Sequence, residues 1–159
     1  MIREHQAGDI GWVISQHGRI YSKEFKFTLP FELDIAKKAI SLLENKDKFT
    51  RLWLKEIRGE NAGSIAISML QQGTAFINFL LVLDKFRGNN IAQELMNQAI
   101  QHAKTHGCQK IRLETYSCLT GARLLYKKLG FQLCESHNNI QKYGQTFEQE
   151  FWELTLNEQ

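Results

Sequence analysis

The sequence predicts an α/β (α+β) protein in which a mixed, mostly antiparallel sheet of six to seven strands is flanked by about four helices. Apolar residues near the N-terminus recur at helical spacing, and from Phe49 onward the period changes to the alternation typical of strands. Helical and strand patterns then follow one another, which indicates helices packed around a sheet. The 159 residues suit one domain, and no repeat or Pro/Gly/Ser-rich linker divides them. We therefore expect a single domain over residues 1–159.

Two helices are expected before the first strand. Asp9 is placed to cap the first helix, which should end near Gln16 because His17-Gly18 follows as a stop signal. Residues 19–29 are aromatic and mixed, and we expect a loop there. The second helix should begin at Thr28–Pro30, since proline is tolerated in a first turn. Its buried face would be formed by apolar residues at helical spacing: Phe31, Ile35, Ala39, Leu42 and Leu43.

Three strands joined by two short turns are expected next, as an antiparallel meander. They cover Leu52–Ile57, Gly63–Leu70 and Thr74–Leu83. The segments between them, residues 58–61 and 71–73, contain the Gly and Asn residues typical of turns. The middle strand alternates larger apolar with small residues, as expected of a strand with a single core face.

The C-terminal half should contain two more helices and three more strands. Gly107 and Gly130 are placed to end the two helices. The expected elements are helix Ile91–His106, strand Lys110–Thr115, helix Thr120–Leu129 and the closing strands Phe131–Glu135 and Phe147–Leu156. The polar segment between the closing strands is expected to be a loop. The predicted element order is α–α–βββ–α–β–α–ββ.

Charge, hydropathy and cysteine count exclude several classes of protein. Twenty Lys and Arg residues against 17 Asp and Glu give a net charge of +3, which is too mild to indicate nucleic-acid binding. The longest apolar run, residues 75–83, is far shorter than the roughly 18 residues of a membrane span, and Met1–His5 shows no secretory signal. Cys108, Cys118 and Cys134 are odd in number and unsuited to a disulfide framework or a zinc site. We expect a cytoplasmic protein with reduced thiols, no metal and no direct nucleic-acid or membrane partner, and a homodimer stays open.

The junction between strand Thr74–Leu83 and helix Ile91–His106 is the strongest candidate for a binding site. A strand that enters a helix through a glycine-containing turn presents free backbone N–H groups and the positive end of the helix dipole, where phosphate binds. Arg87 adds a positive charge, and Gly88 permits close approach of the backbone. The turn lacks the Lys-Ser/Thr of a triphosphate loop and the repeated glycines of a dinucleotide fingerprint. An ordinary strand–helix turn is the alternative.

Two motifs in this order resemble those of the GNAT superfamily of acetyltransferases. Arg87-Gly-Asn-Asn90-Ile-Ala92 is similar to the family pattern Arg/Gln-x-x-Gly-x-Gly/Ala. About 40 residues later, Ala122-Arg-Leu-Leu-Tyr126-Lys-Lys-Leu-Gly130-Phe131 resembles Ala-x-x-Leu-Tyr-x-x-x-Gly-Phe. The segment His5–Tyr21 further resembles the GNAT domain fused to multiple-antibiotic-resistance-type transcription regulators. The resemblance covers nearly the whole chain and implies the GNAT fold.

The resemblance implies acetyl-coenzyme A as co-substrate. Its pantetheine arm would pair with the strand backbone at Leu81, Val82 and Leu83. Its pyrophosphate would be held by the backbone N–H groups of six consecutive residues: Arg87, Gly88, Asn89, Asn90, Ile91 and Ala92. Asn90 stands where the family has a glycine, and Asn is the non-glycine residue that best tolerates positive φ. Leu119 stands where many members place an Asn that contacts the pantetheine arm.

The expected activity is acetyl transfer to a primary amine by direct attack in a ternary complex. A backbone N–H near Val82 would stabilise the oxyanion, and by family analogy Tyr126 would protonate the leaving thiolate. A packed, non-catalytic Tyr126 is the alternative. A non-catalytic acyl-CoA-binding sensor or regulatory module is the alternative function, and it is favoured by Phe76, Asn78 and Phe79, where many members carry a Glu.

The general base and the acceptor stay open. Glu24, Glu32, His17 and Glu114 are candidates for the base by residue type alone, and a water chain would also serve. The acceptor could be a polyamine, an amino acid, an antibiotic, a peptide N-terminus or a protein lysine, and the acyl chain preference is equally open. Three aromatic residues indicate either core or an aromatic wall of the acceptor pocket: Phe25, Phe27 and Phe31. Solvated helix faces are expected for His102, His106 and the pairs Lys37-Lys38 and Lys127-Lys128.

Overall fold

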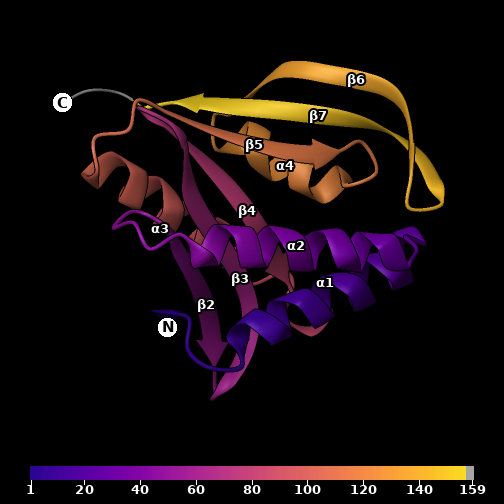
Figure 1. The fold of residues 1–159 in the computed structure, drawn as a ribbon, viewed down its shortest axis with the longest axis horizontal. Helices are drawn as coiled ribbons and strands as arrows, with labels where there is room; N and C mark the ends of the chain where they lie inside the picture. Colours follow the sequence, from indigo (N-terminus) through magenta and orange to yellow (C-terminus); the bar gives the residue numbers. More distant parts are fainter. Residues whose placement is uncertain (157–159) are drawn as a thin grey trace.

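A single seven-stranded sheet forms the centre of the computed structural model, which describes residues 1–156 (Figure 1). The strands are β1 (Ile2–Glu4), β2 (Arg51–Ile57), β3 (Glu60–Gln71), β4 (Thr74–Val82), β5 (Lys110–Tyr116), β6 (Gln132–Lys142) and β7 (Gln145–Thr155). The helices are α1 (Asp9–Phe25), α2 (Leu29–Glu44), the short 3₁₀ turn η1 (Asp84–Phe86), α3 (Ile91–Thr105) and α4 (Thr120–Lys128). The spatial order of the strands is β1-β2-β3-β4-β5-β7-β6. The predicted fold class and element order are confirmed, with β1 as an addition.

Hydrophobic residues pack on both faces of the sheet. On one face, α3 and α4 contribute Leu95, Ala99 and Tyr126 to a core that includes Ile111 and Leu113 of β5. On the other face, α1 and α2 form a second core with β2, β3 and β4, whose members include Val13, Phe31, Leu52, Leu54 and Phe79. Figure 1 shows α1 and α2 lying side by side along one face. The two-sided burial explains why the central strands are rich in apolar residues.

The first helix is longer than expected, because His17-Gly18 does not end it. α1 continues to Phe25, and the segment expected to be a loop is helical. The Nδ1 atom of His17 donates to the carbonyl of Val13 at 2.8 Å, so the side chain supports the helix instead of stopping it. Gly18 faces the carboxylate of Glu32 on α2, where a Cβ atom would clash. A larger residue at this position would require the Glu32 side chain to move, and no local pattern reveals this neighbour.

Asp9 is not a helix cap, which corrects a second expectation. Gly8 occupies the N-cap position with φ 95°. The Asp9 carboxylate instead accepts hydrogen bonds from Arg3 at 2.7 Å and from the backbone N–H of Gln6 at 2.8 Å. These bonds, together with the amide of Asn61 at 3.1 Å, hold the pKa of Asp9 below its usual value and anchor β1. Strand β1 was missed because three residues are too few to show a period.

The polar loop expected between the closing strands is a continuation of both strands. β6 and β7 form a long antiparallel hairpin whose turn is Tyr143-Gly144, with φ values of 56° and 78°. Two positive φ values are typical of a tight hairpin turn. β6 is an edge strand with nearly all residues exposed, so it shows no alternation of apolar residues. Its sequence therefore resembled a loop.

The remaining helix predictions are largely confirmed. Phe31, Ile35 and Ala39 form the buried face of α2, and α3 and α4 end within one residue of their expected ends. The paired lysines of α2 and α4 are exposed. His102 is an exception: its Nε2 atom bonds the carbonyl of Phe49 at 2.8 Å, and its ring packs on Trp53, whereas His106 is exposed. Among the described residues, no helix is both long and apolar enough to cross a membrane.

Candidate functional site

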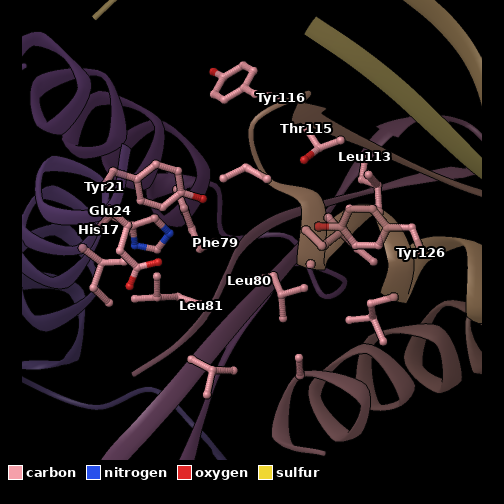
Figure 2. A pocket seen from close by; sticks show the side chains of 18 of the residues that line it. His17, Tyr21, Glu24, Phe79, Leu80, Leu81, Leu113, Thr115, Tyr116 and Tyr126 are labelled. Atoms are coloured by element: carbon pink, nitrogen blue, oxygen red, sulfur yellow. The ribbon is translucent and has the colours of Figure 1, made fainter. Parts of the chain in front are cut away.

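The central parallel pair of strands separates and opens a cleft. β4 and β5 pair from Thr74 and Lys110 as far as Ile77 and Leu113, and no pairing follows. Just beyond this point the backbone of Phe79 has φ 59°, and the register with β3 shifts. The hydroxyl of Ser64 donates to the carbonyl of Phe79 at 2.7 Å and holds this bulge in place. The bulge leaves backbone groups of β4 facing a cavity of about 640 Å³ (Figure 2).

One end of the cleft is formed by the turn between η1 and α3. Gly88 has φ 86° and Asn90 has φ 60° and ψ 22°, so both lie in the left-handed region. Asn90 is the N-cap of α3, and its side chain makes no capping hydrogen bond. The first N–H groups of α3 therefore have no side-chain partner among the described residues, while the helix dipole makes this end positive. This arrangement suits an anion.

Arg87 lies at the same end of the cleft and is bound to α1. Its Nη1 and Nη2 atoms lie 3.1 and 3.0 Å from the two carboxylate oxygens of Glu24, in a bidentate pair. Its Nε atom donates to the carbonyl of Val82 at 3.3 Å, and Asp84 lies 3.6 Å from Nη1. Both groups of the pair are partly exposed, so the contact is open to competition by a stronger anion.

Tyr126 forms the wall of the cleft on the side of α4. The residue is only 6% exposed, and its ring packs near Phe131 and Trp152. Figure 2 shows its hydroxyl pointing toward the space between the strands. No described residue accepts a hydrogen bond from it, and burial raises the pKa of the phenol well above its ordinary value. The phenol therefore carries its proton at neutral pH and presents an O–H donor to the cleft.

Glu150 fixes the position of α4 against the sheet. Its carboxylate is 3.0 Å from Nε of Arg123 on α4 and accepts the indole N–H of Trp152 at 3.0 Å. Because Glu150 is buried on β7, this pair of bonds ties the helix that carries Tyr126 to a rigid strand. Preorganisation of this kind is what a catalytic hydroxyl requires.

Thr115 is a buried residue of the cleft that sequence analysis missed. It is 3% exposed, lines the cavity two residues beyond the last residue of β5 that pairs with β4, and its Oγ1 atom has no hydrogen-bond partner among the described residues. Burying a hydroxyl without a partner costs about 1–3 kcal/mol. The group is therefore tolerated in this place at the expense of stability, as polar groups of binding sites often are.

Replacing Thr115 by valine is expected to leave the unfolding free energy unchanged or to raise it by about 1 kcal/mol, because the unpaired hydroxyl is removed and the shape is kept. Urea denaturation of the ligand-free protein measures this. Thr115→Ser is the control: it keeps the hydroxyl, loses a buried methyl group and should lower stability by about 1 kcal/mol. A valine variant less stable than the serine variant would show that the hydroxyl has a partner.

The four candidates for a general base differ in their surroundings. The Nδ1 atom of His17 carries a proton that it donates to Val13, and burial lowers the pKa of the imidazole to about 4, so the ring is neutral. Glu24 is paired with Arg87, and Glu32 does not line the cleft. Glu114 lines the cleft on the side of α1 and α2, and among the described residues its carboxylate accepts one hydrogen bond, from the amide of Gln149 at 2.6 Å. Glu114 is therefore the carboxylate best placed to accept a proton.

The structure brings most of the predicted site residues to this one cleft. The cavity is lined by Leu81, Val82, Arg87, Gly88, Asn90, Ile91, Ala92 and Tyr126. Leu83 and Asn89 are not in the lining. The N–H of Leu83 bonds Ala62 at 2.8 Å, and the side chain of Asn89 bonds the carbonyl of Phe86 at 3.1 Å. The part of the chain that the structure describes contains no group of three or more His, Cys, Asp or Glu placed to hold a metal.

Comparison with known proteins establishes the family to which this chain belongs. The profile of the acetyltransferase (GNAT) family matches residues 15–131, which is most of the chain. The chain belongs to this family. Over 77 residues it is 35% identical to the N-alpha-acetyltransferase MAK3 of Arabidopsis thaliana, in a match that covers 46% of the chain and 40% of that protein.

Solved GNAT structures share the whole fold. An N-acetyltransferase of Staphylococcus aureus Mu50 superposes with a TM-score of 0.82 at 20% identity, over 99% of this chain and 98% of the other. A Salmonella typhimurium protein solved with its cofactor acetyl-CoA superposes with a TM-score of 0.75 at 17% identity, over 100% and 95%. At these identities the likeness extends to the fold, and the chemistry must be argued from the cleft.

Proposed function

We propose that this GNAT protein transfers the acetyl group of acetyl-CoA to a primary amine by direct attack within a ternary complex. The observation that carries the proposal is the single cleft that joins the uncapped, positive end of α3 to the buried hydroxyl of Tyr126. An anion site and a proton donor at two places in one cleft suit a donor with a pyrophosphate and a leaving thiol. The acetyl-CoA held by the Salmonella typhimurium protein of the same fold supports this donor.

The residues of the cleft fit the donor. The free N–H groups at Asn90, Ile91 and Ala92 and the guanidinium of Arg87 are suited to the pyrophosphate, and a Cβ atom on Gly88 would meet nothing within 4 Å, so space is open there. The unpaired edge of β4 near Val82 is suited to the amides of the pantetheine arm. When bound, acetyl-CoA supplies an acetyl thioester.

Three groups of the chain would take part in the reaction: a proton acceptor, an oxyanion stabiliser and a proton donor. Glu114 accepts a proton from the acceptor ammonium, directly or through water, which frees the nitrogen to form the new C–N bond. A backbone N–H of β4 near Val82 donates to the thioester oxygen as it gains negative charge. Tyr126 donates its proton to the sulfur as the C–S bond breaks and recovers one from solvent. As the C–N bond forms, the attacking nitrogen loses its second proton to solvent, and Glu114 then releases its own proton there. Ammonium and thioester thus become amide, thiol and one proton in solvent.

The release of free thiol tests this function. We expect thiol to appear from acetyl-CoA only when an amine is present, and the acetylated amine to appear in equal amount by mass spectrometry. A non-catalytic acyl-CoA-binding module is the alternative, and the absence of a carboxylate at Asn78 and Phe79 of β4 favours it. Such a module would bind acetyl-CoA and release no thiol with any amine. A cytoplasmic location remains a prediction, and a homodimer stays open.

Replacing Glu24 by glutamine is expected to tighten coenzyme A binding about two- to fivefold, because the pyrophosphate no longer competes with the carboxylate for Arg87. Isothermal calorimetry at low salt measures this. Pantetheine, which lacks the pyrophosphate, should bind both proteins equally. When Arg87 has already been replaced by glutamine, Glu24→Gln should change coenzyme A affinity little. If it still tightens binding as much as in the parent protein, Glu24 acts through its negative charge and not through its contact with Arg87.

A further inference from the structure

The cleft has two chemically different halves. The donor half, on the side of α3 and α4, contains the turn at Arg87–Ala92 and Tyr126. The acceptor half, on the side of α1 and α2, contains His17, Tyr21 and Phe79, which Figure 2 shows across the open space from Tyr126. If the donor occupies the first half, as the proposed function requires, the second half selects the amine. The inference below rests on that function.

Aromatic rings from four different elements line the acceptor half. They are Tyr21 and Phe25 of α1, Phe31 of α2, Phe79 of β4 and Tyr116 of β5. The rings of Tyr21 and Phe31 stack with centroids 4.4 Å apart, and Tyr21 is 5.3 Å from Phe25. Of the three phenylalanines considered from sequence, Phe25 and Phe31 reach the cleft, whereas Phe27 lies in the core behind them. The acceptor half is therefore a rigid apolar wall that suits a flat apolar group.

Charges in the acceptor half are few. Glu114 is the cleft carboxylate without a cationic partner among the described residues, because Glu24 is paired with Arg87. Lys38 also lines this half and would repel a second cation on the acceptor. Glu114 can bind one ammonium group, and Lys38 disfavours a second. This half of the cleft therefore suits a substrate with a single ammonium group. A polyamine or a lysine-rich peptide would bring several cations to a wall of aromatic rings.

The cleft has a volume typical of small-molecule sites. The cavity of about 640 Å³ includes the donor half, so only part of it is left for the amine. Small-molecule sites of this size are lined mainly by hydrophobic and aromatic side chains with a few polar groups that set the orientation. The acceptor half has this composition, with Glu114 as the orienting group.

We propose that the acceptor is a small primary amine that carries an aromatic or similarly flat apolar body. Its ring packs between Tyr21, Phe25 and Tyr116, and its ammonium group faces Glu114. The aromatic body supplies binding energy, and the single carboxylate directs the nitrogen toward the thioester. Alkylamines without a ring, polyamines and basic peptides are poorer substrates.

The test compares 2-phenylethylamine with n-butylamine, spermidine and a lysine-containing tetrapeptide, by thiol release from acetyl-CoA. We expect kcat/KM for 2-phenylethylamine to exceed that for n-butylamine by at least about tenfold, as burial of a ring predicts. Phe25→Ala should lower this ratio about threefold or more. Phe76→Ala, the same change at a half-buried ring of β4 that lies outside the cleft lining and pairs with Ser68 and Arg112, should leave the ratio unchanged.

Equilibrium binding separates this inference from the proposed function. Saturation-transfer NMR on the protein loaded with coenzyme A should detect 2-phenylethylamine and not spermidine, and this needs no turnover. Selective binding of the aromatic amine without thiol release would contradict the proposed function and support the aromatic acceptor class. Thiol release that is fastest with spermidine or the tetrapeptide would support the function and overturn the acceptor class. An unaltered substrate ratio in Phe25→Ala would also overturn it.

Discussion

Tyr126→Phe is expected to lower kcat by about 10²–10⁴-fold, which corresponds to roughly 2.7–5.4 kcal/mol of barrier. The change removes one oxygen from a ring that is otherwise packed against Phe131 and Trp152, so the fold should persist. The hydroxyl makes no hydrogen bond to a described residue, and its raised pKa keeps it protonated. The loss should therefore fall on the chemical step. Steady-state kinetics with the best amine, together with calorimetric binding of coenzyme A, measures both quantities.

An acyl donor with a more acidic thiol is the control for the role of Tyr126. Its thiolate needs less protonation, so it should restore part of the rate in Tyr126→Phe and change the parent rate less. A Phe variant that turns over at the parent rate while chemistry is rate-limiting would show that Tyr126 only packs. Urea denaturation should give the two proteins similar unfolding free energies, and a large difference would assign the lost rate to misfolding.

Coenzyme A at about 100 times its dissociation constant is expected to stabilise the protein by roughly 2.7 kcal/mol, because it binds the folded state alone. Pantetheine at the same concentration should stabilise it much less, since it lacks the pyrophosphate that we propose the turn at Gly88 and Asn90 binds. Urea denaturation with each ligand measures the difference. Equal stabilisation by both ligands would contradict a pyrophosphate site at the start of α3.

Substitution of Asn90 tests the geometry of the same turn. The backbone of Asn90 has φ 60°, a conformation that costs a non-glycine residue roughly 1–2 kcal/mol and a β-branched residue more. Asn90→Gly should therefore keep or improve coenzyme affinity, whereas Asn90→Val should weaken it about tenfold. Calorimetry measures the coenzyme A affinity of each variant, and the ratio of the two affinities is the test. Equal affinities would show that the turn adapts without the left-handed residue.

The elements with strong local signals were predictable from sequence. The meander of β2, β3 and β4 and the helices α2, α3 and α4 have regular apolar periods, and α3 and α4 are followed by glycines. Their limits are close to those expected, except that β3 begins three residues early, at Glu60, within the segment expected to be a turn. The left-handed turn at Asn90 was also expected, because a motif places a glycine there and Asn tolerates positive φ. The errors arose at residues that were interpreted as helix stop or cap signals but whose contacts are with residues outside that helix. Gly18 packs against Glu32 of α2, and Asp9 holds Arg3 and Gln6.

Only the donor half of the candidate site could be predicted from the sequence. The residues of the proposed donor half lie in two contiguous motifs, so Arg87–Ala92 and Tyr126 could be named from the resemblance of these motifs to those of the GNAT superfamily. The acceptor half is assembled from α1, α2, β4 and β5, and nothing in the spacing of Tyr21, Phe79, Thr115 and Tyr116 connects them. Glu114 was one of four carboxyl or imidazole groups considered by type, and only its position in the cleft separates it from the others.

The sequence by itself determined the fold class, the order of the elements other than β1, and the position of the turn that we propose binds the donor. It could do so because the apolar period and the residues of a contiguous motif are local properties that need no knowledge of the fold. Tertiary structure decided where β4 and β5 part, and therefore that a cleft exists between Phe79 and Thr115. It also decided which face of each strand lines that cleft and brought Arg87 to Glu24, 63 residues away in the chain. It left Glu114 as the cleft carboxylate without a cationic partner among the described residues. These are relations between residues far apart in sequence, set by packing energies summed over the whole core, and no local pattern encodes them.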